Sequence, residues 1–359
     1  MRRALSLAMR GMGLTSPDPM VGCVLVRDGR IIGEGWHRRF GSPHAEPEAL
    51  MDAARRGEDP RGATAYVTLE PCCHWGKTPP CAQRLVREGV SRVVAATVDP
   101  FPKVRGGGLD VLREAGLDVT VPCLEDEARW IARGFFHVHE RGRPWVTLKA
   151  AVGLDGRMAL RDGTSKWITG PDARAWAHVM RASHDALLVG VGTVLRDDPA
   201  LTVRDAEGRD PLRVVLDTRL RTPPGAKVVR GEGGCLILTA SEDGGKIGAL
   251  ADAGADVVSL PTCDGRVDLE AALTHLANRG VLTLMVEGGP RVLSTFIDCG
   301  LADQLSLFVA PRILGEGPGL GTGLALSSVA DAFGLERTTT RRIGRDILLE
   351  GRFTCSQGS

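Results

Sequence analysis

The chain has 359 residues, which corresponds to about two globular domains. Its 45 basic and 44 acidic residues nearly balance, and apolar residues make up 43% of the chain. These proportions are typical of globular proteins, they exclude extensive disorder, and they give no electrostatic indication of nucleic-acid binding. We therefore expect no nucleic acid among the partners. No apolar run approaches the roughly 20 residues of a membrane helix, so we expect no membrane contact either.

The first residues and the cysteines predict a cellular compartment. Arg10 interrupts the first apolar stretch too early for a signal peptide, so an amphipathic helix is expected there. The nine cysteines are scattered through the chain, apart from a cluster at Cys72, Cys73 and Cys81. We therefore expect a cytoplasmic protein with reduced cysteines, in which a cysteine cluster indicates a metal or a catalytic site.

The first half of the chain alternates short apolar runs with helical patterns, which is typical of a layered α/β domain. The expected strands are Met20–Val26, Arg30–Gly35, Ala65–Leu69, Arg92–Val98 and Asp118–Val121. The expected helices are Ala45–Arg56, Pro80–Glu88, Leu109–Ala115 and Glu125–His137. The segment Glu140–Pro144 has no periodicity and contains Gly and Pro, which predicts a boundary between a domain over residues 1–142 and one over residues 143–359.

The second half predicts another α/β domain. The expected strands are Trp145–Ala151, Ala186–Val191, Leu212–Asp217, Cys235–Thr239, Asp256–Leu260, Leu282–Glu287 and Leu305–Ala310. The expected helices between them are Pro171–Ala182, Leu269–Arg279 and Pro290–Cys299. Glycine-rich segments at residues 231–234 and 315–323 are expected to be surface loops.

A histidine and two cysteines predict a catalytic zinc site in the first domain. His44 and Glu46 open a predicted helix, and Pro71-Cys72 follows a predicted strand, with Cys81 before the next helix. One imidazole and two thiolates leave the fourth position of a zinc ion open for water, whose pKa falls to about 7. This is the pattern of the zinc nucleobase deaminases, H-x-E followed by P-C-x-x-C, in which a glutamate such as Glu46 moves the proton. Here six residues are inserted between the two thiolates, Cys72 and Cys81.

Each part of this pattern has a plainer interpretation. A histidine and a glutamate at the start of a helix are usually a solvated first turn, but their pairing with Pro-Cys and a second cysteine favours a zinc site. Cys73 is expected to be a small packed side chain rather than a ligand. The insert His74–Pro80 offers an imidazole and the ammonium of Lys77 to an anionic substrate, or it is a surface loop stiffened by two prolines.

Four segments of the first domain resemble the RibD family of bifunctional riboflavin biosynthesis enzymes: Pro17–Cys23, Gly33–His37, His44–Glu46 and Cys72–Cys81. The family pairs a diaminohydroxyphosphoribosylaminopyrimidine deaminase with a 5-amino-6-(5-phosphoribosylamino)uracil reductase. The resemblance implies a cytidine-deaminase-like three-layer domain with one zinc ion. It implies zinc ligands His44, Cys72 and Cys81, proton carrier Glu46, and substrate contacts His37, His74, Lys77 and Asp99.

Three positions depart from the family pattern. Asp18 and Phe101 stand where asparagines are expected, and Gly153 stands where a serine near the nicotinamide is common. An amide donates and accepts hydrogen bonds, whereas an ionised Asp only accepts and a Phe does neither. These departures leave the zinc chemistry unchanged and leave open which pyrimidine is bound.

The second domain lacks the G-x-G-x-x-G fingerprint at its first strand–helix turn. An apolar run ends instead at Glu287-Gly-Gly-Pro290, where a helix start would bind a diphosphate or would simply be capped. Lys149 is one of only six lysines and lies in an apolar strand, so with Glu287 it forms either a catalytic pair or a structural ion pair. Asp217 alone would suggest NAD, but Thr218-Arg-Leu-Arg221 offers positive charge for a 2′-phosphate, which favours NADPH.

Leu148–Arg157, Ser165–Thr169, Asp197–Arg204 and Val286–Pro290 resemble the reductase half of the same family. This resemblance implies a dihydrofolate-reductase-like domain that uses NADPH, with Lys149 and Glu287 as catalytic residues. The implied NADPH contacts are Ala151, Trp167, Thr193, Asp197, Thr218, Gly289, Pro290, Arg291, Val292, Leu293, Ser294 and Thr295. The implied ribose-phosphate contacts are Ser165, Arg181, Leu201, Arg204 and Glu287. Without the resemblance, each of the two arginines would be interpreted as a solvated surface residue.

The sequence therefore predicts deamination of a phosphoribosylated pyrimidine followed by NADPH reduction of its ribosyl group to a ribityl chain. The resemblance also implies a homo-oligomer. Two alternatives stay open at this point. One is a related deaminase–reductase with a different pyrimidine substrate, and the other is a binding module in which zinc only stabilises the fold.

Overall fold

The computed structural model describes residues 1–75 and 79–354 and divides into two compact units, Met1–Gly142 and Arg143–Ser359. The first unit contains a five-stranded sheet in the order β2-β1-β3-β4-β5. Strand β1 is antiparallel to β2 and to β3, whereas β3, β4 and β5 are parallel. The strands are β1 Gly22–Arg27, β2 Arg30–Trp36, β3 Thr64–Val67, β4 Arg92–Ala95 and β5 Asp118–Thr120.

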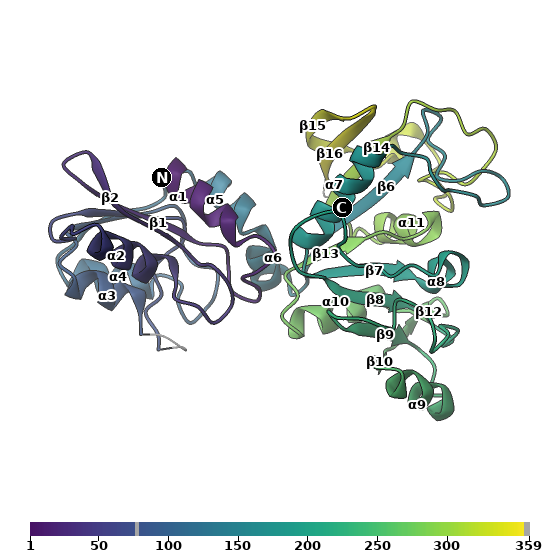
Figure 1. The fold of residues 1–359 in the computed structure, drawn as a ribbon, viewed down its shortest axis with the longest axis horizontal. Helices are drawn as coiled ribbons and strands as arrows, with labels where there is room; N and C mark the ends of the chain where they lie inside the picture. Colours follow the sequence, from purple (N-terminus) through teal and green to yellow (C-terminus); the bar gives the residue numbers. More distant parts are fainter. Residues whose placement is uncertain (76–78, 355–359) are drawn as a thin grey trace. The chain divides into compact units, whose positions relative to one another are not determined.

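Helices cover both faces of this sheet, so the first unit has three layers (Figure 1). Its helices are α1 Arg2–Ala8, η1 Met9–Gly11, α2 Ala45–Arg55, α3 Cys81–Arg87, α4 Gly107–Glu114, α5 Glu125–Ile131 and α6 Arg133–Arg141. Apolar side chains of α2, α3 and α4, among them Ala49, Leu85 and Leu112, pack on one face of the sheet. On the other face, Leu7 of α1 packs against Val24, and Leu5 packs with Ala128 of α5.

The single helix expected over Glu125–His137 is wrong, because the structure contains two helices there. The chain leaves the helical conformation at Ala132, where φ is −91° and ψ is 20°. Gly134, a poor helix former, lies two residues after the break. The change of direction buries Phe135 and Phe136, which a continuous helix pattern did not predict.

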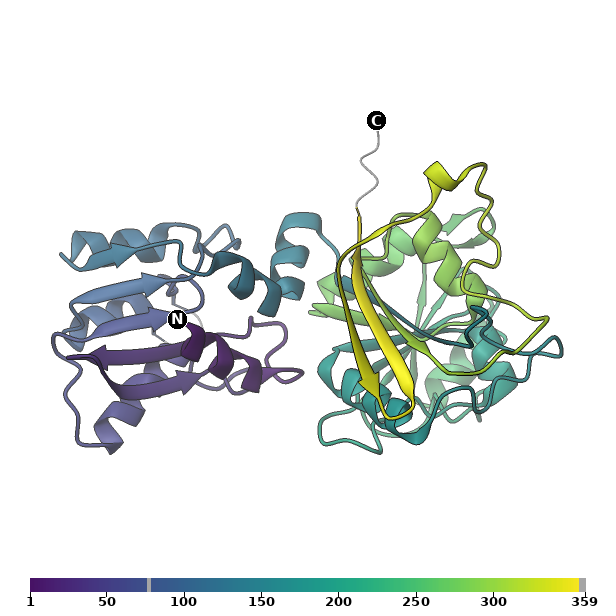
Figure 2. The same cartoon turned by 90° about the horizontal axis from the view of Figure 1, so that it is seen from above.

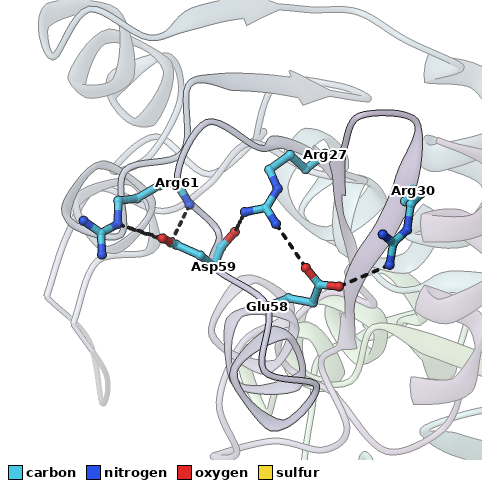
Figure 3. Close-up of polar contacts among 5 residues, drawn as sticks. All are labelled: Arg27, Arg30, Glu58, Asp59 and Arg61. Carbon is cyan, nitrogen blue, oxygen red and sulfur yellow. Dashed lines mark hydrogen bonds and ion pairs between the residues drawn. The ribbon is translucent and has the colours of Figure 1, made fainter.

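A polar network connects the β1–β2 turn with the loop before β3 in the first unit (Figure 3). The Glu58 carboxylate accepts hydrogen bonds from Arg27 at 3.1 Å and from Arg30 at 3.3 Å. Arg27 also donates to the carbonyl of Asp59, whose carboxylate accepts the backbone N–H of Arg61. Such exposed pairs contribute little to stability.

The second unit contains a nine-stranded sheet in the order β10-β9-β8-β7-β13-β6-β14-β16-β15, which is parallel from β10 to β14. Strands β16 and β15 complete it as an antiparallel hairpin, drawn in yellow in Figure 2. The strands are β6 Trp145–Val152, β7 Ala186–Gly190, β8 Leu212–Leu216, β9 Cys235–Thr239, β10 Ala255–Ser259, β13 Thr283–Val286, β14 Gln304–Val309, β15 Leu335–Ile343 and β16 Asp346–Phe353. A separate small hairpin pairs β11 Thr262–Cys263 with β12 Arg266–Val267.

The inner parallel strands, such as β7, β9 and β13, are buried on both faces, which explains their nearly continuous apolar sequences. In β7, Leu187 and Val189 pack with Met180 of α7, whereas Leu188 packs with the helices of the opposite face. One face carries α10 Leu269–Asn278 and α11 Pro290–Asp298, and the other carries α7 Pro171–Ser183, α8 Val191–Asp197 and α9 Gly244–Asp252. A short η2 helix spans Val329–Asp331.

The expected α/β fold class is confirmed, but several elements of the second unit were not expected. Helix α8 follows Gly190, helix α9 begins with two glycines, and the β15–β16 hairpin has no alternating apolar pattern. Every residue of β15 between its two ends is exposed, and the register shifts between Glu336 and Thr339. Among the described residues, none of the helices has the length and apolar character needed to cross a bilayer.

Candidate metal centre and reductase site

The candidate metal centre combines the starts of two helices with the turn after β3. His44 is the N-cap of α2, Cys81 is the first residue of α3, and Cys72 lies between β3 and α3. His44 Nδ1 is 3.7 Å from Cys72 Sγ and 3.4 Å from Cys81 Sγ. Tetrahedral zinc, with Zn–N of about 2.1 Å and Zn–S of about 2.3 Å, requires nitrogen and sulfur about 3.6 Å apart. The donor set therefore fits a zinc ion.

The protonation of one of the two thiols, Cys72, also suits a metal. The Cys81 thiol and then His44 donate hydrogen bonds that lower the pKa of Cys72 to about 4. The backbone N–H of Cys81 adds a hydrogen bond to Cys72 Sγ at 3.3 Å. A thiolate, the form in which cysteine binds zinc, is thus favoured at Cys72. Cys73 Sγ points elsewhere and lies 3.7 Å from the carbonyl oxygen of Lys103.

Glu46 lies beside the ligands without belonging to the donor set. It is 3% exposed in the first turn of α2, and its carboxyl group is in hydrogen-bond contact with the Cys81 thiol. Burial, and next the negative charge of Cys72, raises the pKa of Glu46 above its usual range. A carboxyl group with a raised pKa can accept and release a proton under mild conditions. Between residues 1 and 354, with 76–78 left out, His44, Cys72 and Cys81 are the one such metal-ligand cluster.

Two of the predicted substrate contacts are buried near this centre. The His37 ring lies 5.4 Å from the His44 ring, with Nε2 3.2 Å from the carboxylate of Asp18. Asp99 is 6% exposed, and burial raises its pKa to about 7. Asp18, one of the departures from the family pattern, is therefore a direct neighbour of His37.

His74 of the insert lies in a cluster of rings that includes His139, a residue that the sequence analysis did not single out. The His74 ring lies 6.1 Å from Phe101, and Phe101 lies 5.1 Å from His139 of α6. Phe135 packs 4.5 Å from the same His139 ring. Nothing in the local sequence around His139 indicated this contact, because it depends on the break between α5 and α6. Lys77, the other predicted contact of the insert, lies outside the described residues.

In the second unit, two cations converge on one buried carboxylate. Glu287 follows β13, and Arg181 Nη2 lies 2.6 Å from its Oε2. Lys149 Nζ of β6 is 3.8 Å from Glu287 Oε1 and 5.6 Å from the Phe308 ring. Burial alone would raise the pKa of Glu287, but Arg181 and then Lys149 outweigh it and lower the pKa to about 2. The structure therefore brings these three predicted residues together, with Arg181 already paired.

The other predicted substrate contacts lie along the same region of the chain. Arg181 Nη1 donates to the carbonyl of Thr202, and the backbone N–H of Arg204 donates to His178 on the same helix α7. The loop that contains Leu201 and Arg204 thus lies against α7. Arg204 is exposed, whereas Leu201 is 3% exposed and has a φ of 57°.

The predicted NADPH contacts gather at one edge of the sheet. Thr193 follows β7, the parallel neighbour of β13, and Thr218 follows β8, the parallel neighbour of β7, so both share the carboxyl edge of the sheet with Glu287. Ala151 belongs to the parallel strand β6. Ligands of α/β sheets bind at such carboxyl ends.

Loops bring further predicted residues to this region. Lys166 Nζ lies 3.6 Å from the Asp197 carboxylate, so the segment of Ser165 and Trp167 contacts the end of α8. Trp167 is 62% exposed and stacks on Arg174 at 4.5 Å. A large exposed aromatic ring of this kind is available to a planar ligand.

The turn before α11 is tight and requires glycine. Gly289 is the N-cap and Pro290 the first residue of α11, and a Cβ at Gly288 would lie 2.7 Å from Val292 Cβ. Arg291 and Val292 complete the first turn, whose N–H groups suit a phosphate. Leu293 is fully buried, Ser294 Oγ donates to the Leu320 carbonyl, and Thr295 Oγ1 donates to the Arg291 carbonyl, so their side chains serve the protein itself.

Comparisons with known proteins agree with both halves. Residues 1–97 match the cytidine and deoxycytidylate deaminase zinc-binding region, and residues 144–349 match the RibD C-terminal domain. The riboflavin biosynthesis protein RibD of Aquifex aeolicus is 42% identical over 97% of this chain and 96% of its own length. That of Escherichia coli is 40% identical over 97% of each chain. The chain belongs to the RibD family.

A solved structure supports the same assignment. The diaminohydroxyphosphoribosylaminopyrimidine deaminase/5-amino-6-(5-phosphoribosylamino)uracil reductase of Thermotoga maritima has a TM-score of 0.88 and 38% identity. The match covers 99% of this chain and 97% of that one. The predicted zinc-dependent deaminase and reductase halves of a RibD enzyme are thereby confirmed, whereas the individual substrate and cofactor contacts stay predictions.

Proposed function

We propose that this chain catalyses two successive steps of riboflavin biosynthesis. In the first unit, 2,5-diamino-6-(5-phosphoribosylamino)pyrimidin-4(3H)-one is deaminated hydrolytically, and in the second the ribosyl group of the product is reduced with NADPH. The observation that carries the proposal is the His44, Cys72 and Cys81 donor set beside the buried Glu46. Its distances suit a metal with one position left for solvent, which catalysis requires and a purely structural zinc does not.

Zinc, when bound by these three residues, supplies a water of lowered pKa as the nucleophile. Glu46 takes a proton from the attacking water and delivers it to the amino group, which leaves as ammonia while the ring carbon becomes a carbonyl. His37 and Asp99 hold the pyrimidine edge, and His74 and Lys77 hold the phosphoribosyl group. The raised pKa of Glu46 suits a residue that must give its proton back within each cycle.

The reductase step uses the buried charges around Glu287. NADPH, when bound along the carboxyl edge of the sheet, supplies the hydride. Lys149 donates a proton as the sugar ring opens, and Glu287 holds the Lys149 ammonium in place. Ser165 and the exposed Arg204 bind the substrate phosphate, to which a guanidinium is well suited.

A related deaminase–reductase with another pyrimidine substrate is the second candidate. It is favoured by Asp18, whose carboxylate lies 3.2 Å from His37 Nε2, and by Phe101 in place of an expected asparagine. Both departures change which hydrogen bonds a pyrimidine can form with the site.

One incubation distinguishes the two candidates. Purified, zinc-loaded protein receives the diaminopyrimidine precursor and NADPH, and ammonia and the absorbance of NADPH are followed together. We expect ammonia first and NADPH oxidation afterwards, in equal amounts. Zinc-loaded protein that releases no ammonia from this precursor would rule out the proposed substrate.

We also infer that the enzyme is a cytoplasmic homo-oligomer. The nine cysteines are odd in number and scattered through a long chain, which favours a reducing compartment. Size-exclusion chromatography with light scattering measures the subunit number, and a monomer at working concentration would contradict the expected oligomer.

A further inference from the structure

Glu70 is a buried carboxylate to which the proposed reaction assigns no role. It is 3% exposed and lies two residues before the zinc ligand Cys72. Each of its oxygens accepts two backbone N–H groups from a segment about thirty to forty positions further along the chain. Oε2 accepts from Asp99 at 3.1 Å and Gly106 at 3.0 Å, and Oε1 accepts from Gly108 at 2.9 Å and Leu109 at 3.2 Å.

Three consecutive glycines allow this segment to come so close. Gly106 has a φ of 83°, which favours glycine. A Cβ on Gly108 would lie 1.8 Å from the carbonyl oxygen of Pro71, and one on Gly107 would lie 3.0 Å from Cys73 Sγ. The start of α4 therefore rests directly on the turn that carries Cys72.

The Glu70 contacts also determine where Asp99 lies. The backbone N–H of Asp99 is held by Glu70, and the Asp99 carboxylate accepts the backbone N–H of Phe101 at 2.8 Å. Phe101 packs against His74 and His139. One carboxylate thus connects the metal turn with the segment expected to bind the pyrimidine.

We propose that Glu70 is a positioning residue that fixes the Asp99–Phe101 segment relative to the zinc ligands and thereby sets the affinity for the pyrimidine. The inference rests on the proposed deaminase function. Glu70 acts through Asp99 and touches neither the metal ligands' donor atoms nor the substrate.

The variant Glu70→Gln tests this role because it keeps the volume and removes acceptors. A glutamine offers one acceptor oxygen and an NH₂ group that would face two N–H donors. Two buried N–H groups then lack a partner, and the segment moves away to find water. We expect the KM for the diaminopyrimidine to rise at least tenfold, with kcat changed less than threefold and one zinc retained per chain.

The matched control is Glu58→Gln in the same unit. The Glu58 carboxylate accepts from the side chains of Arg27 and Arg30 (Figure 3), not from the backbone N–H groups that Glu70 holds. We expect its deaminase KM, kcat and zinc content to equal those of the wild type. NADPH oxidation by the second unit, assayed with the deaminated substrate, should be the same in both variants.

A second measurement does not depend on whether Glu70→Gln folds. Hydrogen exchange of the full wild-type chain should show the N–H groups of Asp99 and Gly106 protected as strongly as those of β3, although both lie outside helices and strands. Fast exchange at both positions would overturn the inference.

The remaining outcomes separate the inference from the proposed function. An active wild type whose Glu70→Gln variant keeps the wild-type KM would overturn the positioning role alone. Loss of zinc in Glu70→Gln would also overturn it, since Glu70 would then support the metal turn rather than the Asp99 segment. A zinc-loaded wild type that releases no ammonia refutes the proposed substrate, whatever the variant does.

Discussion

The two sites are built in different ways. The metal centre uses three ligands from two short motifs, and each ligand lies at the start of a helix or in the turn before one. The reductase site draws Lys149 from β6, Arg181 from α7 and Glu287 from the position after β13, and successive residues of this set are more than thirty positions apart. A site made of local motifs can be found from sequence spacing, whereas a site made at a sheet edge exists only once the strand order is known.

This contrast predicts that the deaminase and reductase activities can be lost independently of each other. Removing zinc from the purified protein with a chelator should abolish ammonia release, because the bound zinc is what lowers the pKa of the attacking water. The rate of NADPH oxidation with deaminated substrate should be unchanged, because His44, Cys72 and Cys81 all belong to the first unit. Added zinc should restore ammonia release; parallel loss of both activities would show that the two units depend on each other.

Glu46→Gln sharpens the contrast within the metal centre. We expect kcat for deamination to fall by about 10²- to 10⁴-fold, the usual contribution of a positioned acid–base group. Zinc content, measured by elemental analysis, should stay at one per chain because Glu46 is no ligand. Turnover equal to the wild type would exclude the proposed proton transfer.

Lys149→Ala makes the corresponding test in the reductase unit. We expect NADPH oxidation to fall by about 10²-fold while ammonia release keeps its wild-type rate. Lys246→Ala is a suitable control, because Lys246 is 54% exposed and pairs with Asp243 rather than with Glu287. A wild-type reduction rate in Lys149→Ala would leave the structural ion pair as the better interpretation.

The smallest expected effect concerns stability in acid. The pKa of Glu287 is lowered from 4.5 to about 2 in the folded protein, which corresponds to about 3 kcal/mol. Because the folded-state pKa is the lower one, this stabilisation is fully present above pH 4.5 and is lost as the pH falls from 4.5 towards 2. Urea unfolding of the second unit at several pH values measures it.

Glu287→Gln should be less stable at pH 7 and should lose less stability than the wild type between pH 4.5 and 2. Glu316→Gln, whose partner Arg161 is exposed, should follow the wild-type curve. Identical curves for Glu287→Gln and the wild type would mean that Arg181 and Lys149 do not hold the charged carboxylate.

Much of the metal centre was predictable from the sequence, and the reason is local. The pattern His44-x-Glu46 with Pro71-Cys72 and Cys81 fixes ligand types and chain order, and the resemblance to the RibD family adds their roles. The sequence does not reveal that Glu70 accepts four backbone N–H groups, since its partners follow a strand and a loop later in the chain. His139 is hidden for a similar reason, because α6 turns toward Phe101 only after the break at Ala132.

In the second unit, the parallel strands were predictable because burial on both faces leaves continuous apolar runs. Strand β15 was not, because an edge strand exposed on both faces needs no apolar residues at all. The pairing of Arg181 with Glu287 was also not predicted. Arg181 lies in the helix before β7 and Glu287 follows β13, and the two residues meet only because β7 and β13 are adjacent in the sheet.

Strand β15 has a further consequence for how the protein behaves at high concentration. Its outer side ends the nine-stranded sheet, and an unpaired strand edge is a template onto which another chain can add. The register shift after Glu336 interrupts that template, and the adjacent arginines Arg341 and Arg342 place positive charge along it. Replacing both arginines with valine would therefore make this edge strand prone to aggregation.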